Sequence, residues 1–314
     1  HPTGMVWPPS VRGILVTEGV RGEGGVLRNS EGRRFMFDDI PPNYRGQTAD
    51  NEEEGWRYTQ GDKAARRPPE LLTRDHVARC IMREVRDGRG SPHGGVFLDI
   101  AWIRERLPNG AEHIRKKLPS MYHQFKQLAN IDITTTPMEV GPTTHYIMGG
   151  VKVDGDTQMS TVPGLFAAGE CAAGLHGANR LASTSMLEGM LWGHRAAEAI
   201  AAELPRIAAP EAHQFAAWQP PSESEEPDPL LVDQDWSLIR TTLWNYAGII
   251  RSGARLERGR ADMGYLYHRI ERFYREAPLS RRIIELRSAI ICARLILKAA
   301  LLNRESRGCH YRVD

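Results

Sequence analysis

The sequence predicts a multidomain protein of the α+β or α/β class. Residues 1–143 alternate short apolar runs with glycine turns and amphipathic stretches, a pattern typical of small sheets with helices packed on them. Residues 144–203 lead from a short apolar run through a glycine-rich turn into a helical pattern. Residues 204–230 are rich in proline and are expected to be a linker, whereas residues 231–314 carry apolar side chains at helical spacing.

The composition argues against several classes of function. The chain has 314 residues and a net charge of +2, so neither nucleic acid nor an acidic membrane surface is predicted as its main partner. Its four cysteines include no C-x-x-C pair, which predicts neither a zinc site nor a disulfide scaffold and suits a reducing compartment. The most apolar stretch, residues 289–302, is interrupted by Arg294 and Lys298, so no membrane span is expected.

The first segment is expected to place an arginine at the start of a helix. Residues 14–17 and 26–27 should be short strands on either side of a glycine turn, and the polar residues 45–69 should form a loop. A helix is predicted to follow, with Thr73 or Asp75 as its cap. Arg74 would then lie at the helix start, where the helix dipole disfavours a cation. We therefore expect a nearby group whose interaction requires an arginine at this position. A strand over 96–100 and helices near 111–117 and 122–128 complete the segment.

The second segment has the features of a ligand site. A strand-like run at 165–168 ends in Gly169-Glu170, and a glycine-rich turn follows that carries His176, Asn179 and Arg180. Ser185 and Glu188 then stand three residues apart, which predicts a capped helix start. A helix start reached through glycines presents backbone N–H groups, so an anionic ligand, or a ring that becomes anionic, should be stabilised there.

Several motifs, in the same order along the chain, resemble one known family. They are HPTG, LVTEG, RGEGG, R-D-x-V-x-R, HYxMGG, VPGLFAAGE, HGANRL and ESRG-x-H. They are similar to the flavoprotein subunit of succinate dehydrogenase and fumarate reductase, with L-aspartate oxidase as a sister family. The resemblance implies a capping domain at 1–143, the returning part of a Rossmann-like FAD-binding domain at 144–203 and a C-terminal helical domain at 231–314. No G-x-G-x-x-G motif follows a strand, so the other half of the flavin domain is expected to lie outside this sequence.

The resemblance also implies a cofactor, a reaction and a set of site residues. FAD would exchange a hydride with a small dicarboxylate, and an arginine would donate or accept the proton. The implied proton path consists of Arg74, Glu18 and Arg21; the substrate residues are His1, Thr17, His145 and Arg180; and the flavin residues are Glu170, Asn179, Ser185 and Met186. The implied partner is an iron–sulfur subunit of a membrane-associated complex, which would place the protein in the cytoplasm, at the cytoplasmic face of a membrane.

Three interpretations stay open at this stage. The motif PMEVGPTTHY and the threonine in LVTEG favour the succinate dehydrogenase and fumarate reductase branch. The run from Arg180 to Ser185 resembles L-aspartate oxidase, while Thr184 and Met186 depart from the usual residues of both branches. The third interpretation is a non-catalytic binding or assembly fragment, because a chain without the fingerprint half could fail to bind flavin alone.

Overall fold

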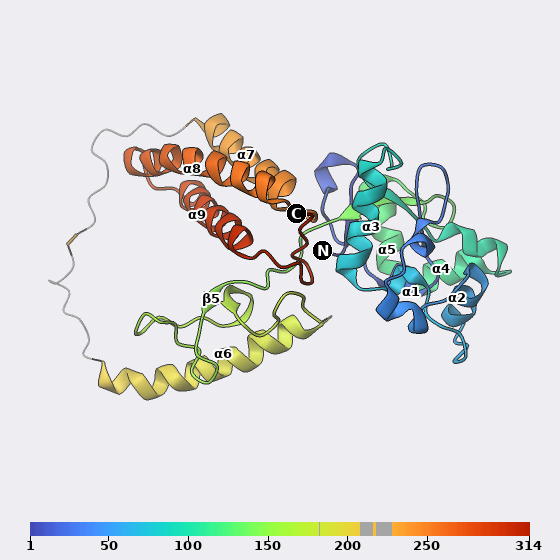
Figure 1. Cartoon of the computed structure of the whole chain (residues 1–314), viewed down its shortest axis with the longest axis horizontal. Helices are drawn as coiled ribbons and strands as arrows, with labels where there is room; N and C mark the ends of the chain where they lie inside the picture. Colours follow the sequence, from blue (N-terminus) through green and yellow to red (C-terminus); the bar gives the residue numbers. More distant parts are fainter. Residues whose placement is uncertain (182, 208–215, 218–227) are drawn as a thin grey trace. The chain divides into compact units, whose positions relative to one another are not determined.

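The chain divides into two compact units, His1–Tyr146 and Ile147–Asp314. The structure is a computed structural model and describes residues 1–181, 183–207, 216–217 and 228–314. Each unit has its own apolar core, and both helices and strands are present (Figure 1). This mixed architecture, with helices at its C-terminal end, confirms the predicted fold class.

The first unit is built on a four-stranded antiparallel sheet. The strand order is β1-β4-β3-β2, so the first strand pairs with the last one of the unit. Thr3 lies opposite Pro142, and Val96 lies opposite Val140. The strands are β1 (Thr3–Met5), β2 (Val26–Arg28), β3 (Val96–Asp99) and β4 (Met138–Pro142). Because the two ends of the unit meet in one sheet, residues near His1 and near Pro142 lie side by side.

The first unit also contains five α-helices, of which α3 contacts β3 and β4 (Figure 1). Their apolar faces and the inner face of the sheet share one core, in which Ile81, Leu98 and Phe125 are almost completely buried. The predicted strand at 96–100 and the predicted helices near 74–85, 111–117 and 122–128 are confirmed. The helices are α1 (Gly19–Gly22), α2 (Glu52–Thr59), α3 (Arg74–Arg86), α4 (Gly110–Lys117) and α5 (Pro119–Ala129).

Two expectations for the first unit are wrong. The predicted loop at 45–69 contains α2, whose start is capped by the Asn51 side chain, which accepts the Glu54 N–H at 2.9 Å. The cap and the acidic first turn stabilise this helix although its composition is polar. The predicted strand at 14–17 is reduced to a single bridge between Leu15 and Gly4.

A buried ion pair joins the end of α3 to the strand region. Glu84 is 6 % exposed and accepts hydrogen bonds from Arg89 Nε (2.8 Å), Arg89 Nη2 (2.9 Å) and Asn29 Nδ2 (2.9 Å). The Arg89 bonds lower the pKa of Glu84 below its usual range, burial opposes them, and the Asn29 bond adds to the lowering. A carboxylate whose pKa is lower in the folded state stabilises the fold at pH values above its unfolded pKa and loses this effect as the pH falls through the folded pKa.

We therefore expect Glu84→Gln to lower the free energy of unfolding by about 2 kcal/mol at pH 7. The loss should be clearly smaller at the lowest pH at which the unmodified protein still folds, because Glu84 is then largely protonated. Urea unfolding at the two pH values measures both quantities. An equal loss at both would mean that the charge of Glu84 contributes nothing.

The second unit begins with a small parallel pair of strands, β5 (Val151–Lys152) and β6 (Ala172–Ala173), followed by the long helix α6 (Thr184–Glu203). The predicted strand at 165–168 is wrong, since Phe166 forms only an isolated bridge with Met159. Several apolar side chains of α6 face solvent: Met186 (77 % exposed), Leu187 (65 %), Met190 (70 %) and Leu191 (45 %).

The rest of the second unit is a three-helix bundle, as the apolar spacing predicted (Figure 1). The side chains of Asp228, Ser252 and Ser280 cap the three helix starts by accepting backbone N–H groups. The helices are α7 (Pro229–Ala247), α8 (Gly253–Glu276) and α9 (Arg281–Leu302). Most of the expected linker at 204–230 lies outside the described residues, and no helix of the described part has the length and apolarity needed to cross a membrane.

Candidate active site

Glu18 and Arg21 are positioned by a single turn of helix at the edge of the core. Val16 (1 % exposed) and Val20 (0 %) are buried on either side of Glu18 and fix this turn in the core of the first unit. Glu18 stands at the N-cap of α1 and is half-buried, whereas Arg21 is 1 % exposed. The sequence TEGVR thus places a carboxylate at the surface of the core and a guanidinium inside it.

Arg74 meets this turn from the start of α3. Its Nε donates to Glu18 Oε2 at 2.8 Å, and Arg21 Nη2 lies 3.8 Å from the same oxygen. Glu18 is therefore the partner that the unfavourable position of Arg74 led us to expect. The structure brings together all three residues of the predicted proton path, which we call the Arg–Glu–Arg cluster.

The environment of Arg21 is unusual for an arginine. Burial lowers its pKa, the charge of Glu18 opposes this, the charge of Arg74 adds to the lowering, and the charge of Glu70 opposes it. Its Nε has no hydrogen-bond partner within the described residues, and its Nη1 donates to the backbone oxygen of Glu70. A buried guanidinium with a lowered pKa is better suited to exchange a proton with a neighbour than an exposed one.

A narrow cleft beside the cluster is lined by His1, Arg21, Arg74 and Pro142, among others. Thr17 and His145 belong to the same unit but lie outside this lining. Thr17 is exposed, and its Oγ1 accepts the Gly19 N–H at 3.3 Å; His145 is also exposed. Of the four predicted substrate residues, His1 lines this cleft. Thr17 directly precedes Glu18 of the cluster in the sequence.

The predicted flavin residues and Arg180 belong to the second unit. Glu170 Oε1 accepts the Ile147 N–H at 2.9 Å, which ties the start of this unit to the turn before β6. Asn179 Oδ1 accepts from the Cys309 thiol at 3.4 Å, and the Cys309 N–H donates to the Ala178 oxygen at 3.0 Å. Arg180 Nη1 donates to the Leu181 oxygen at 2.8 Å. The glycine-rich turn is thus held from one side by the C-terminal ESRG-x-H segment.

The predicted cap of α6 is wrong. The helix begins at Thr184 after Ser183, which has a left-handed backbone (φ 65°) and makes no side-chain cap hydrogen bond. Ser185 therefore lies inside the first turn. The buried carboxylate of Glu188 lies 2.8 Å from His176 Nε2. The sequence contained both residues of this pair but gave no sign that they meet, since the contact depends on how the glycine turn folds back.

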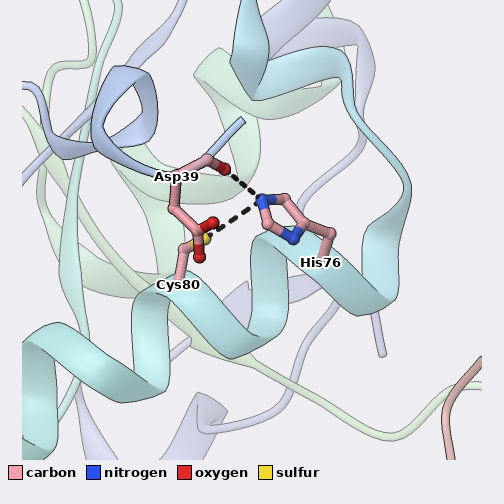
Figure 2. Close-up of side chains that lie close together, drawn as sticks. All are labelled: Asp39, His76 and Cys80. Carbon is pink, nitrogen blue, oxygen red and sulfur yellow. Dashed lines mark hydrogen bonds between the residues drawn. The ribbon is translucent and has the colours of Figure 1, made fainter. Parts of the chain in front are cut away.

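A second cluster of polar groups consists of His76 and Cys80 on α3 and of Asp39, and none of the three lines the cleft (Figure 2). The ligand atoms of Asp39, His76 and Cys80 lie within 4.8 Å of one another, close enough to hold a metal ion. His76 Nε2 donates to the Asp39 backbone oxygen at 2.6 Å and lies 3.4 Å from Cys80 Sγ, while the Asp39 carboxylate pairs with Arg83 at 2.8 Å. Because these contacts already engage the three groups, we interpret the cluster as a structural hydrogen-bond network.

Burial raises the pKa of the Cys80 thiol to about 12, and the charge of Asp39 adds to this effect. We therefore expect iodoacetamide at about pH 8 to leave Cys80 unmodified in the folded protein, because the reactive thiolate is scarce and shielded. The exposed Cys292 is the internal control and should be modified. Peptide mass spectrometry measures both residues, and fast modification of Cys80 without denaturant would contradict the prediction.

Comparison with known proteins identifies the family. A family model described as an FAD binding domain matches residues 1–186, which is more than half of the chain. The chain belongs to this FAD-binding family. A second model, described as the C-terminal part of the fumarate reductase flavoprotein, matches residues 237–314 of this FAD-binding protein. Both matches confirm the resemblance found in the motifs.

Two kinds of curated relatives match equally well. The chain is 36 % identical over 331 residues to a fumarate reductase (CoM/CoB) subunit of Methanothermobacter marburgensis, covering 100 % of the chain and 52 % of that protein. It is also 36 % identical over 317 residues to L-aspartate oxidase of Pseudomonas aeruginosa, covering 100 % of the chain and 51 % of the relative. The chain thus spans about half the length of the curated relatives it matches.

Two solved structures also resemble the chain over its whole length. The Sdh1 complex of Mycobacterium smegmatis with UQ1 contains a chain that is 41 % identical, with a TM-score of 0.69; the match covers 100 % of this chain and 49 % of that one. A quinol-fumarate reductase with menaquinol is 26 % identical with a TM-score of 0.75, over 100 % of this chain and 53 % of the other.

FAD is the cofactor of this FAD-binding family, and the start of α6 suits it. Because the Ser183 side chain makes no cap hydrogen bond, the first N–H groups of this 20-residue helix lack the usual cap within the described residues. These groups, around Ser185 and Met186, could stabilise a flavin ring that becomes anionic on reduction. The nearby Gly169 has a left-handed backbone (φ 73°), which would strain any other residue, although a Cβ there would meet Gly189 of α6 only at an ordinary distance of 3.5 Å.

Proposed function

We propose that this chain belongs to a flavin-dependent oxidoreductase that interconverts succinate and fumarate, with Arg74 as the proton donor or acceptor. The observation that carries the proposal is the Glu18 oxygen shared by Arg74 and Arg21. Bound FAD would supply the hydride acceptor or donor. The protein groups would hold the two carboxylates of the substrate and move one proton.

In this proposal the proton passes along the Arg–Glu–Arg cluster. Arg74 would exchange it with the substrate carbon, and Glu18 would pass it between the two guanidiniums of Arg74 and Arg21. The Glu18 side chain is 35 % exposed, so the path would exchange its proton with solvent there. Glu18 is within hydrogen-bond distance of Arg74, and the pKa of Arg21 is lowered mainly by its burial. His1, Thr17, His145 and Arg180 would bind the carboxylates, because histidine, threonine and arginine donate hydrogen bonds to carboxylate oxygens. Glu170, Asn179, Ser185 and Met186 would contact the flavin.

The proposed domain roles rest on the resemblance of the motifs to this family. Residues 1–143 would form the capping domain that closes over the substrate, and residues 144–203 would complete the flavin domain. Residues 204–230 would be a linker to the C-terminal helical domain, residues 231–314. An iron–sulfur subunit is the proposed electron partner, with the complex on the cytoplasmic face of a membrane. A non-catalytic assembly fragment is the contrary case, in which the purified protein would show no flavin absorption.

L-aspartate oxidase is the second candidate function. It is supported by an L-aspartate oxidase relative at 36 % identity, the same value as for the fumarate reductase relative, and by the run from Arg180 to Ser185. An oxidase would take aspartate to iminoaspartate and would need no iron–sulfur partner.

The deciding experiment uses the full-length flavoprotein that contains this chain. Turnover is measured with succinate, with fumarate and with L-aspartate, each with an artificial electron acceptor or donor and with oxygen. Oxidation of succinate without oxidation of aspartate supports the first candidate. Oxygen-dependent oxidation of aspartate supports the second, and flavin-loaded protein that is inactive on all three would refute both.

A further inference from the structure

A second, fully buried ion pair lies directly behind the Arg–Glu–Arg cluster. Glu70 is 0 % exposed, and its carboxylate accepts two hydrogen bonds from Arg34, from Nε at 2.7 Å and from Nη2 at 2.8 Å. The Arg34 guanidinium also lies 4.7 Å from the centre of the Phe37 ring. A bidentate pair of this kind fixes the orientation of both partners.

Glu70 is connected to both arginines of the cluster. Its backbone oxygen accepts a hydrogen bond from Arg21 Nη1, so the position of Glu70 directly sets the position of that guanidinium. Glu70 also lies in the short helical turn Pro69–Leu71, four residues before Arg74. The segment that ends at the start of α3 is therefore anchored in the core by the Glu70 carboxylate.

Arg21 has few other contacts that hold its charged end. Its Nε has no hydrogen-bond partner among the described residues, and Glu18 lies at 3.8 Å, which is an ion pair without a close hydrogen bond. The Glu70 oxygen is thus the acceptor that orients the Arg21 guanidinium. If the Arg34–Glu70 pair loosens, Arg21 loses this support and the spacing of the cluster changes.

We propose that Arg34 and Glu70 are positioning residues that hold Arg21 and the start of α3 in the arrangement needed for proton transfer. This inference rests on the proposed function for its catalytic consequence, but not for its structural part. It predicts that a change in the buried pair alters turnover without touching substrate or flavin. A displacement of about 1 Å in such an arrangement can lower a rate roughly 10²-fold.

The test compares Glu70→Gln with Glu84→Gln in the full-length flavoprotein. Glu84 is a matched control because it is also buried, also bidentate to one arginine and in the same unit, yet it contacts Asn29 and Arg89 and not Arg21. We expect Glu70→Gln to lower kcat roughly 10²-fold with KM and flavin content nearly unchanged. Glu84→Gln should lower only the melting temperature. Equal kcat values for the two variants would overturn the proposal.

A second measurement does not depend on activity. Phenylglyoxal modifies accessible arginines, and peptide mass spectrometry reports each site. Arg21 is 1 % exposed. It should be protected from phenylglyoxal in the protein without substitutions and in Glu84→Gln, but it should react in Glu70→Gln. Protection of Arg21 in Glu70→Gln would refute the positioning role even if the protein oxidises neither succinate nor aspartate, so this failure is distinct from a failure of the proposed function.

Arg34→Lys serves if Glu70→Gln does not fold. Lysine keeps the positive charge beside Glu70 but cannot form both bonds of the fork. We expect a smaller loss of kcat than in Glu70→Gln, together with partial modification of Arg21. Full activity and a fully protected Arg21 in this variant would count against the proposal.

Discussion

Arg74→Lys is expected to lower turnover of the full-length flavoprotein by about 10³-fold or more, with its flavin content nearly unchanged. Lysine keeps the charge at the start of α3 but cannot reproduce the planar donor group whose Nε meets Glu18 Oε2 at 2.8 Å. Removing a positioned proton donor typically costs 10²–10⁴-fold, roughly the range we expect here. The measurements are kcat with the preferred substrate and the visible flavin absorption per protein.

Arg79→Lys is the control for this prediction. Arg79 lies on the same helix but pairs with Asp75 Oδ2 at 2.9 Å and not with Glu18. Its turnover should stay close to that of the unmodified protein. Loss of flavin in Arg74→Lys with full turnover per remaining flavin would show that Arg74 is not the proton donor.

Gly95→Ala is expected to destabilise the first unit by about 3 kcal/mol or to prevent its folding. A Cβ at this buried position would collide with the backbone oxygen of Val140 and would lie 2.9 Å from its carbonyl carbon and 3.2 Å from Val6 Cγ1. The colliding atoms belong to the β4 backbone, which pairs with β3, so they cannot move aside without disturbing the sheet. Thermal or urea unfolding measures the effect.

Gly46→Ala is the matched control. A Cβ there would meet nothing within 4 Å. We expect this variant to be as stable as the unmodified protein or slightly more stable, because alanine restricts the unfolded chain. A Gly95→Ala protein of unchanged stability would mean that β3 and β4 can separate more easily than the geometry indicates.

The sequence predicted those features that depend on local periodicity and on helix ends. The three C-terminal helices and α3 follow from apolar spacing, and the unfavourable position of Arg74 correctly indicated a partner for it. The partner, Glu18, lies 56 positions earlier in the chain, and no local pattern links the two residues. Only the tertiary packing of α1 against the start of α3 brings them together.

The errors have a similar cause. α2 was missed because half of its residues are charged, while the Asn51 cap that stabilises it is a single side chain. The predicted Ser185–Glu188 cap failed because Glu188 instead meets His176, which lies 12 residues earlier. The Arg34–Glu70 pair was not predicted, because two ordinary charged residues 36 positions apart give no signal in the sequence that they are buried together.

The charges of the Arg–Glu–Arg cluster do not cancel. Arg21 and Arg74 are two cations that share one anion, Glu18, while Arg34 and Glu70 neutralise each other. One surplus positive charge therefore remains beside the cleft lined by His1. An anion approaching the cluster from solvent is attracted before it makes any hydrogen bond, and dissolved salt weakens such attraction beyond a distance of about 10 Å. Capture of a doubly charged acid should accordingly slow as ionic strength rises.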